Sequence, residues 1–80
     1  MKELKKAANR YNDLIAMVCG RAFVKYGRLD YAAFSNEIGI SVSTLRRRLD
    51  DPETITLGEL HKIASVLKLE QDEIKEKLPV

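Results

Sequence analysis

Three consecutive arginines, Arg46, Arg47 and Arg48, are the residues of this sequence with the most specific binding chemistry. A guanidinium group donates two parallel hydrogen bonds to O6 and N7 of guanine, and it also pairs with phosphate. Successive helical residues are rotated by about 100°, so three adjacent arginines cannot all face one surface. On a helical wheel Arg47 lies opposite the apolar side, Arg46 flanks it, and Arg48 lies near the apolar boundary. The wheel therefore favours Arg47, then Arg46, for contact with a base; the alternative is an ordinary solvated helix face.

Other kinds of chemistry have little support in the sequence. Cys19 is the one cysteine and His61 the one histidine, which excludes an intramolecular disulfide and argues against a structural zinc site. The sequence has no paired acid and base, activated nucleophile or phosphate-binding glycine loop, so we expect no catalytic residue, metal, cofactor or small-molecule ligand. The longest apolar run, residues 14–20, is far shorter than the roughly 20 residues of a membrane-spanning helix, and we expect a cytoplasmic protein.

Length and charge bound the organisation of the chain. Its 80 residues, 32% of them charged, are enough for one compact domain, and residues 1–80 are therefore predicted to form a single domain. Residues 1–29 carry seven basic and two acidic side chains, whereas residues 51–80 carry four lysines and seven acids. This polarity is compatible with a polyanionic partner, and equally with solvated helix faces.

The apolar residues of the first third of the chain have helical spacing. One recurs every three or four positions, which predicts a long first helix over about residues 2–26, with residues 1–13 as its N-terminal extension. Gly20 is expected to mark a bend or a close helix contact, and Gly27 to end the helix.

Three later helix starts carry one local signal. Asp30, Ser41 and Thr56 can each cap a helix, and apolar residues flank each cap as a hydrophobic staple. The caps predict helices over about residues 31–38, 42–50 and 57–67, and a weaker apolar pattern predicts another over about 71–78. The fold class predicted is therefore all-α, a compact bundle of five helices.

The turn between the second and third helices is the most informative segment. Only Gly39 and Ile40 separate the end of one helix from the cap of the next, and glycine adopts a left-handed conformation without steric penalty. Ile40 is expected to point back into the core against Phe34 or Ile38. Two short helices, a glycine-containing turn and a projecting second helix form a helix-turn-helix unit, here over residues 31–50.

Two stretches, EIGISVSTLRRRL and TLGELHKIASVL, have the spacing of a known family. The signature positions are Leu29, Asp30, Phe34, Ser35, Ile38, Gly39, Ile40, Ser41, Thr44, Leu45, Leu57, Leu60, Ile63, Ala64 and Leu67. From Leu14 to Ile74 the sequence resembles the lambda-repressor-like (XRE-like) helix-turn-helix family, the Cro and phage-repressor type. The family often has glutamine at the position of Tyr31 and alanine at that of Ser35. Residues 1–13 lie outside the resemblance.

The resemblance implies that the helix over residues 42–50 lies in the major groove of double-stranded DNA and that its early residues meet base edges. The expected base contacts are Val42, Ser43, Arg46 and Arg47. The expected phosphate contacts are Tyr31, Ser41, Thr44 and Arg48. Hydroxyl groups and the helix N-terminus suit such contacts. Asp50 lies near this side and would repel phosphate unless Arg46 or Arg47 pairs with it.

The function implied is that of a sequence-specific DNA-binding transcriptional regulator, similar to stand-alone Cro-like or small phage-repressor proteins, and not an enzyme. A homodimer on an inverted repeat is expected, because a single half-site contact is usually weak. Its surface is either the long first helix or residues 69–80. The alternative is a protein-interaction module or an antitoxin component, whose long first helix would bind a partner protein through Ile15, Val18 and Ala22.

Overall fold

The structure is a computed structural model that describes residues 10–78. Its helices are α2 (Asn12–Tyr26), α3 (Tyr31–Ile38), α4 (Val42–Asp50), α5 (Leu57–Leu67) and α6 (Gln71–Lys77), with a 3-10 turn η1 (Pro52–Thr54) between α4 and α5. Residues 10–78 contain no strand, and the predicted all-α fold is confirmed. None of the helices in this range is both long and apolar enough to cross a membrane.

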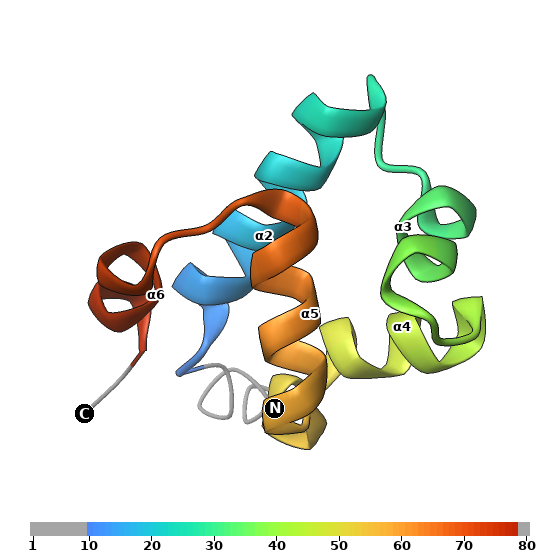
Figure 1. Ribbon diagram of the computed structural model, residues 1–80. Coiled ribbons are helices and arrows are strands. Elements are labelled where there is room, and N and C mark those ends of the chain that lie inside the picture. The colour runs from blue at the N-terminus through green and yellow to red at the C-terminus, as the bar shows by residue number, and fades with distance from the viewer. Residues whose placement is uncertain (1–9, 79–80) are drawn as a thin grey trace, which may run out of the picture.

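The other helices pack around two central helices. α2 and α5 lie side by side, with α3 and α4 on one side of them and α6 on the other (Figure 1). Buried apolar residues from α2 to α5, and one from the turn before α6, form a single core. These residues are Leu14, Val18, Ala22, Phe34, Ile38, Leu45, Ile63, Leu67 and Leu69. Because Val18 and Ala22 are covered by the protein's own helices, the predicted partner-binding stripe on the first helix is wrong.

The predicted N-caps determine where three helices begin. The side chain of Asp30 accepts a hydrogen bond from the N–H of Ala33 at 3.0 Å, and Ser41 caps α4 in the same way. Thr56 forms the full capping box with Glu59 at the start of α5. These side chains satisfy backbone N–H groups that have no partner within the helix. The helices they start match the predicted ranges 31–38, 42–50 and 57–67.

The corner between α3 and α4 is built as predicted. Gly39 adopts a left-handed conformation with φ of 80°, and the N–H groups of Gly39 and Ile40 both donate to the carbonyl of Ser35, at 2.9 and 3.1 Å. Ile40 is half-buried against the core. The chain therefore leaves α3 sharply and enters α4 at the Ser41 cap, so two short helices joined by a glycine-containing turn span residues 31–50.

The first helix differs from its prediction. Arg10 and Tyr11 form a turn, so the continuous helix predicted over residues 2–26 is interrupted there and α2 begins at Asn12. The part of that prediction on residues 1–9 lies outside the described range. Of the two alternatives predicted for Gly20, a bend or a close helix contact, the close contact is wrong, since a Cβ there would meet nothing within 4 Å. The helix ends as predicted, at Gly27, whose φ of 79° is left-handed.

The last helix is attached by features that the sequence pattern did not predict. Lys68 ends α5 in a left-handed conformation with φ of 58°. The chain then turns into α6, where the N–H of Glu70 donates a hydrogen bond to Oε1 of Glu73 at 3.0 Å. Arg21 of α2 donates a hydrogen bond to Glu73, so a charged contact joins α6 to α2.

Candidate nucleic-acid interface

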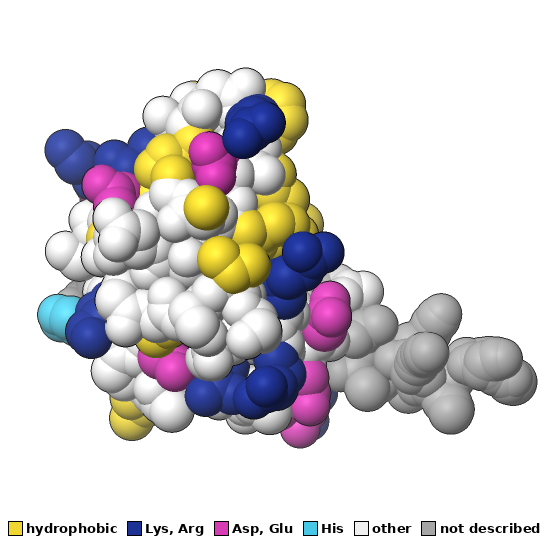
Figure 2. Space-filling model, turned by 90° about the vertical axis from the view of Figure 1, so that its right-hand side faces the viewer, with side chains coloured by type: hydrophobic (Ala, Val, Ile, Leu, Met, Phe, Trp, Pro, Cys, Tyr) yellow, Lys and Arg dark blue, Asp and Glu magenta, His cyan; other side chains and the backbone are white. Residues whose placement is uncertain are grey.

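Helix α4 has one buried side and one free side. Leu45 is 0% exposed and anchors the helix, and Leu49 packs half-buried beside it. Ser43, Arg46 and Arg47 are exposed, as the helical wheel predicts. Figure 2 looks at the side of the molecule that holds α3 and α4, and it shows Lys and Arg side chains gathered on its lower part. A helix held by one buried leucine and exposing cations can approach a polyanion.

The N-terminal turn of α4 presents hydroxyl groups and one apolar side chain. Ser41 Oγ accepts a hydrogen bond from the N–H of Thr44 at 3.1 Å and donates one to Thr44 Oγ1 at 2.9 Å. No acceptor for the hydroxyl proton of Thr44 is found among residues 10–78, so this proton can be donated to an external acceptor. Ser43 Oγ lies 3.3 Å from Ser41 Oγ. Val42 is 37% exposed, so it belongs to the surface of α4 rather than to the core.

Tyr31 and Arg46, predicted for different kinds of contact, lie together. The guanidinium carbon of Arg46 is 4.9 Å from the centre of the Tyr31 ring, within the range of a cation–π interaction. Tyr31 is the first residue of α3 and packs half-buried against the core. The contact joins the exposed side of α4 to the N-terminus of α3.

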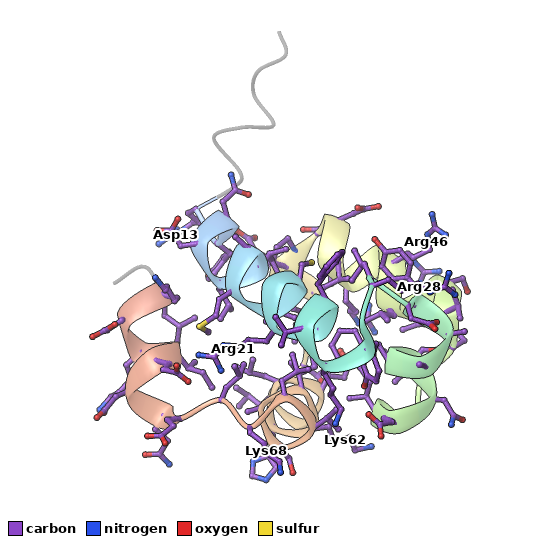
Figure 3. The ribbon with its side chains drawn as sticks, turned by 90° about the horizontal axis from the view of Figure 1, so that it is seen from above. Asp13, Arg21, Arg28, Arg46, Lys62 and Lys68 are labelled. Atoms are coloured by element: carbon purple, nitrogen blue, oxygen red, sulfur yellow. The ribbon has the colours of Figure 1, made fainter. Side chains whose placement is uncertain are left out.

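Arg28 extends this basic surface and was not predicted as a contact residue. Its side chain is 74% exposed, and its Nη2 lies 3.5 Å from Oδ2 of the capping Asp30. Figure 3 shows Arg28 and Arg46 at the same end of the molecule, away from Arg21, which lies between α2 and α6. The sequence feature that could have indicated this role is the position of Arg28 two residues before Asp30, the N-cap of α3. That position puts a cation beside the start of the helix.

Arg48 is placed differently from its neighbours. Its Nε donates a 2.8 Å hydrogen bond to Oε1 of Glu59, and the two side chains are 21% and 16% exposed. The N–H of Thr56 donates to the same carboxylate oxygen at 3.0 Å. These donors, Thr56 first, hold the pKa of Glu59 below its ordinary value. Arg48 thereby links α4 to the start of α5.

Comparison with protein families identifies the family of this domain. The model of the Cro/C1-type HTH DNA-binding domain matches residues 24–76, which begin near the end of α2 and extend through most of α6. The chain belongs to this family. No curated protein and no solved structure matches it.

The Cro/C1-type domain contains every residue predicted to contact DNA, from Tyr31 at the start of α3 to Arg48 on α4. The family is a DNA-binding one rather than a family of enzymes, which identifies the free side of α4 as part of a DNA-binding domain. Within residues 10–78 no group of three histidine, cysteine or acidic side chains is arranged to hold a metal ion. Cys19 of α2 is partly covered, and burial raises the pKa of its thiol.

One acidic residue interrupts the basic side of this Cro/C1-type domain. Asp50 is exposed at the end of α4. Among residues 10–78, neither Arg46 nor Arg47 forms an ion pair with it or with another carboxylate. Both guanidinium groups are therefore available to a ligand, whereas Asp50 disfavours phosphate at this end of the helix.

Proposed function

We propose that this chain is a sequence-specific DNA-binding regulator that inserts α4 into the major groove and braces it with the N-terminus of α3. The observation that carries the proposal is the orientation of α4 in a Cro/C1-type domain. Leu45 is wholly buried, and Ser43 and Arg47 project from the opposite side. A helix of this size fits the width of the major groove, where each base pair presents a distinct pattern of donors and acceptors.

Base contacts are assigned to the early and outer residues of α4. Arg47 and Arg46 can each bind guanine O6 and N7, and their guanidinium groups are not engaged by a carboxylate of the described residues. Val42 exposes methyl groups that suit the methyl group of thymine, and Ser43 exposes a hydroxyl group that can donate or accept.

Phosphate contacts are assigned to the two helix starts and one inner arginine. The hydroxyl proton of Thr44 has no acceptor among the described residues and lies beside the Ser41 cap, where the first N–H groups of α4 also lie. Tyr31 can reach a phosphate with its hydroxyl group. Arg48 has its Nε bound to Glu59, so only its Nη groups remain for a phosphate. Contacts of this kind fix the register of the protein on DNA without reading sequence.

The test of the proposed function is selection from a random library of DNA duplexes at low salt. We expect one sequence to be enriched, as an inverted repeat with half-sites about one helical turn apart. If no duplex sequence is enriched, the regulator is excluded and a protein-interaction module takes its place.

We place the second copy of the proposed homodimer on the apolar groove between α5 and α6. Leu57, the first residue of α5, is 86% exposed beside this groove. The groove is lined by Leu57, Leu60, His61, Ala64, Ser65, Leu69, Gln71 and Ile74. None of these is Lys, Arg, Asp or Glu. Because a two-fold axis brings residues close to their own copies, a lining without such charges avoids like-charge repulsion.

The dimer surface is tested with two matched charge insertions. Leu57→Glu should shift the protein to monomer in sedimentation and weaken binding to the inverted repeat more than binding to a half-site. Val24→Glu, at a 79% exposed apolar position of α2, is the control and should change neither. If Val24→Glu gave a monomer and Leu57→Glu did not, the dimer interface would lie on the exposed side of α2. If neither variant changed the oligomeric state, the groove between α5 and α6 and the exposed side of α2 would both be excluded as the interface.

A further inference from the structure

The side chain of Arg46 crosses from α4 to α3 and rests on an aromatic ring. Its guanidinium carbon is 4.9 Å from the centre of the Tyr31 ring. Fifteen positions separate the two residues in the sequence, so the contact exists only because the Gly39 corner folds α4 back against α3. Cations bind the face of an aromatic ring because the π-electrons there are negative.

The ring that receives Arg46 is held in place on its other sides. Tyr31 is half-buried and packs against the hydrophobic core. Tyr31 directly follows Asp30, the N-cap of α3. The Asp30 side chain accepts a hydrogen bond from the N–H of Ala33, which fixes the first turn of α3. A tyrosine held by core contacts and a capped helix start is a stable support for a long, flexible arginine.

A guanidinium group above an aromatic ring retains hydrogen-bonding capacity. Its five N–H donors point outward in several directions, and the ring contacts the group on one side only. Arg46 on the Tyr31 ring can therefore still donate to a base or a phosphate. Because the Arg46 side chain is already restrained in the free protein, it loses less conformational entropy on binding DNA than an unrestrained arginine would. Preorganisation of this kind raises the affinity for DNA.

We propose that Tyr31 is a positioning residue that holds Arg46 ready for DNA through the face of its ring. This inference rests on the proposed function and adds to it a role of the ring that is separate from any phosphate contact of the hydroxyl group. It gives a physical reason for an aromatic residue at a position where the resembled family often has glutamine.

The test compares variants of Tyr31 in two backgrounds, with affinity for the selected duplex measured by fluorescence anisotropy. Tyr31→Phe keeps the ring and removes the hydroxyl group, so the difference between Tyr31→Phe and Tyr31→Leu isolates the ring. With Arg46 present, we expect Tyr31→Leu to bind about two- to fivefold more weakly than Tyr31→Phe. In the Arg46→Ala background this difference should disappear.

Two further measurements separate positioning from a structural role. Side-chain NMR signals of Arg46 in the free protein should show a ring-current shift that survives in Tyr31→Phe and is lost in Tyr31→Leu. Thermal unfolding shows whether each variant is folded. If Tyr31→Leu does not fold, Tyr31→Gln replaces it, since glutamine keeps a polar group without a ring.

The outcomes also separate this inference from the proposed function. Specific binding by the wild type with equal affinities for the Phe and Leu variants, or with the same difference in the Arg46→Ala background, overturns the inference alone. A wild-type chain that prefers no duplex sequence overturns the proposed function and this inference with it.

Discussion

Arg48 of α4 and Glu59 of α5 are joined by a 2.8 Å hydrogen bond between Nε and Oε1, with both side chains largely covered. The same carboxylate completes the capping box of α5 by accepting from the N–H of Thr56. One acidic side chain therefore serves both the start of α5 and the attachment of α4. This attachment acts together with the buried Leu45 to hold α4 against the rest of the domain.

Removing the charge of Arg48 should destabilise the domain. Arg48→Met keeps most of the apolar stem but leaves Glu59 without its charged donor, and we expect a loss of about 1–2 kcal/mol in the free energy of unfolding. Urea denaturation followed by circular dichroism measures it. Arg47→Met is the matched control on the exposed side of α4 and should change stability by less than about 0.5 kcal/mol. Equal losses for the two variants would contradict the structural role of Arg48.

The stability of the domain should depend on pH through Glu59. The N–H of Thr56, and then the Arg48 guanidinium, hold the pKa of Glu59 below its ordinary value of 4.5. Because the pKa is lower in the folded than in the unfolded state, the stabilisation is complete above pH 4.5 and is lost as the pH falls through the folded-state pKa. Glu59→Gln should thus be less stable than wild type at neutral pH, and the gap should narrow in acid.

Unfolding curves recorded at neutral pH and at about pH 3 measure this narrowing. Glu53→Gln, at an exposed position of η1, is the control and should stay close to wild type at both values. A gap for Glu59→Gln that is the same at the two pH values would count against the assigned pKa shift.

Local signals in the sequence predicted most of the helix boundaries. An N-cap acts on a backbone N–H only three residues away, so Asp30, Ser41 and Thr56 could be recognised without any knowledge of the tertiary structure. The left-handed Gly39 belongs to the same class, because the short turn demands it. The sorting of α4 into a buried side and an exposed side followed from helical geometry alone.

Features that depend on how helices cross could not be predicted. The contacts of Arg46 with Tyr31 and of Arg48 with Glu59 join different helices, and nothing in the local sequence specifies these partners. Periodicity also predicted one helix running through Tyr11, since an apolar pattern shows which side is covered but not where a helix is interrupted. Tyr11 continues the pattern yet lies in a turn, without a side-chain cap.

Two glycines should respond in opposite directions to substitution by alanine. Gly20 lies within α2 with open space around it, so Gly20→Ala should raise the free energy of unfolding by up to about 1 kcal/mol. Gly39 has a φ of 80°, a conformation that costs alanine roughly 1 kcal/mol or more, although space is available for the methyl group. Thermal unfolding of the two variants, each compared with wild type, checks both signs. A stabilising Gly39→Ala would contradict the left-handed corner.

Arg47 should determine which base pair the protein prefers at one position of its DNA site. Removing Arg47 should therefore change sequence preference, whereas removing a phosphate contact should lower the affinity for all duplexes alike. Arg47→Ala is expected to weaken binding to the selected duplex by about 1–3 kcal/mol and to relax the preference at one base pair. Lys75→Ala, an exposed cation on α6, which lies on the other side of α2 and α5 from α4 (Figure 1), is the control for a general loss of charge. Anisotropy titrations on the selected duplex and on single-base variants measure both effects. If Arg47→Ala lowered the affinity equally for all duplexes, Arg47 would be a phosphate contact. Arg46 would then be the arginine of α4 that contacts a base.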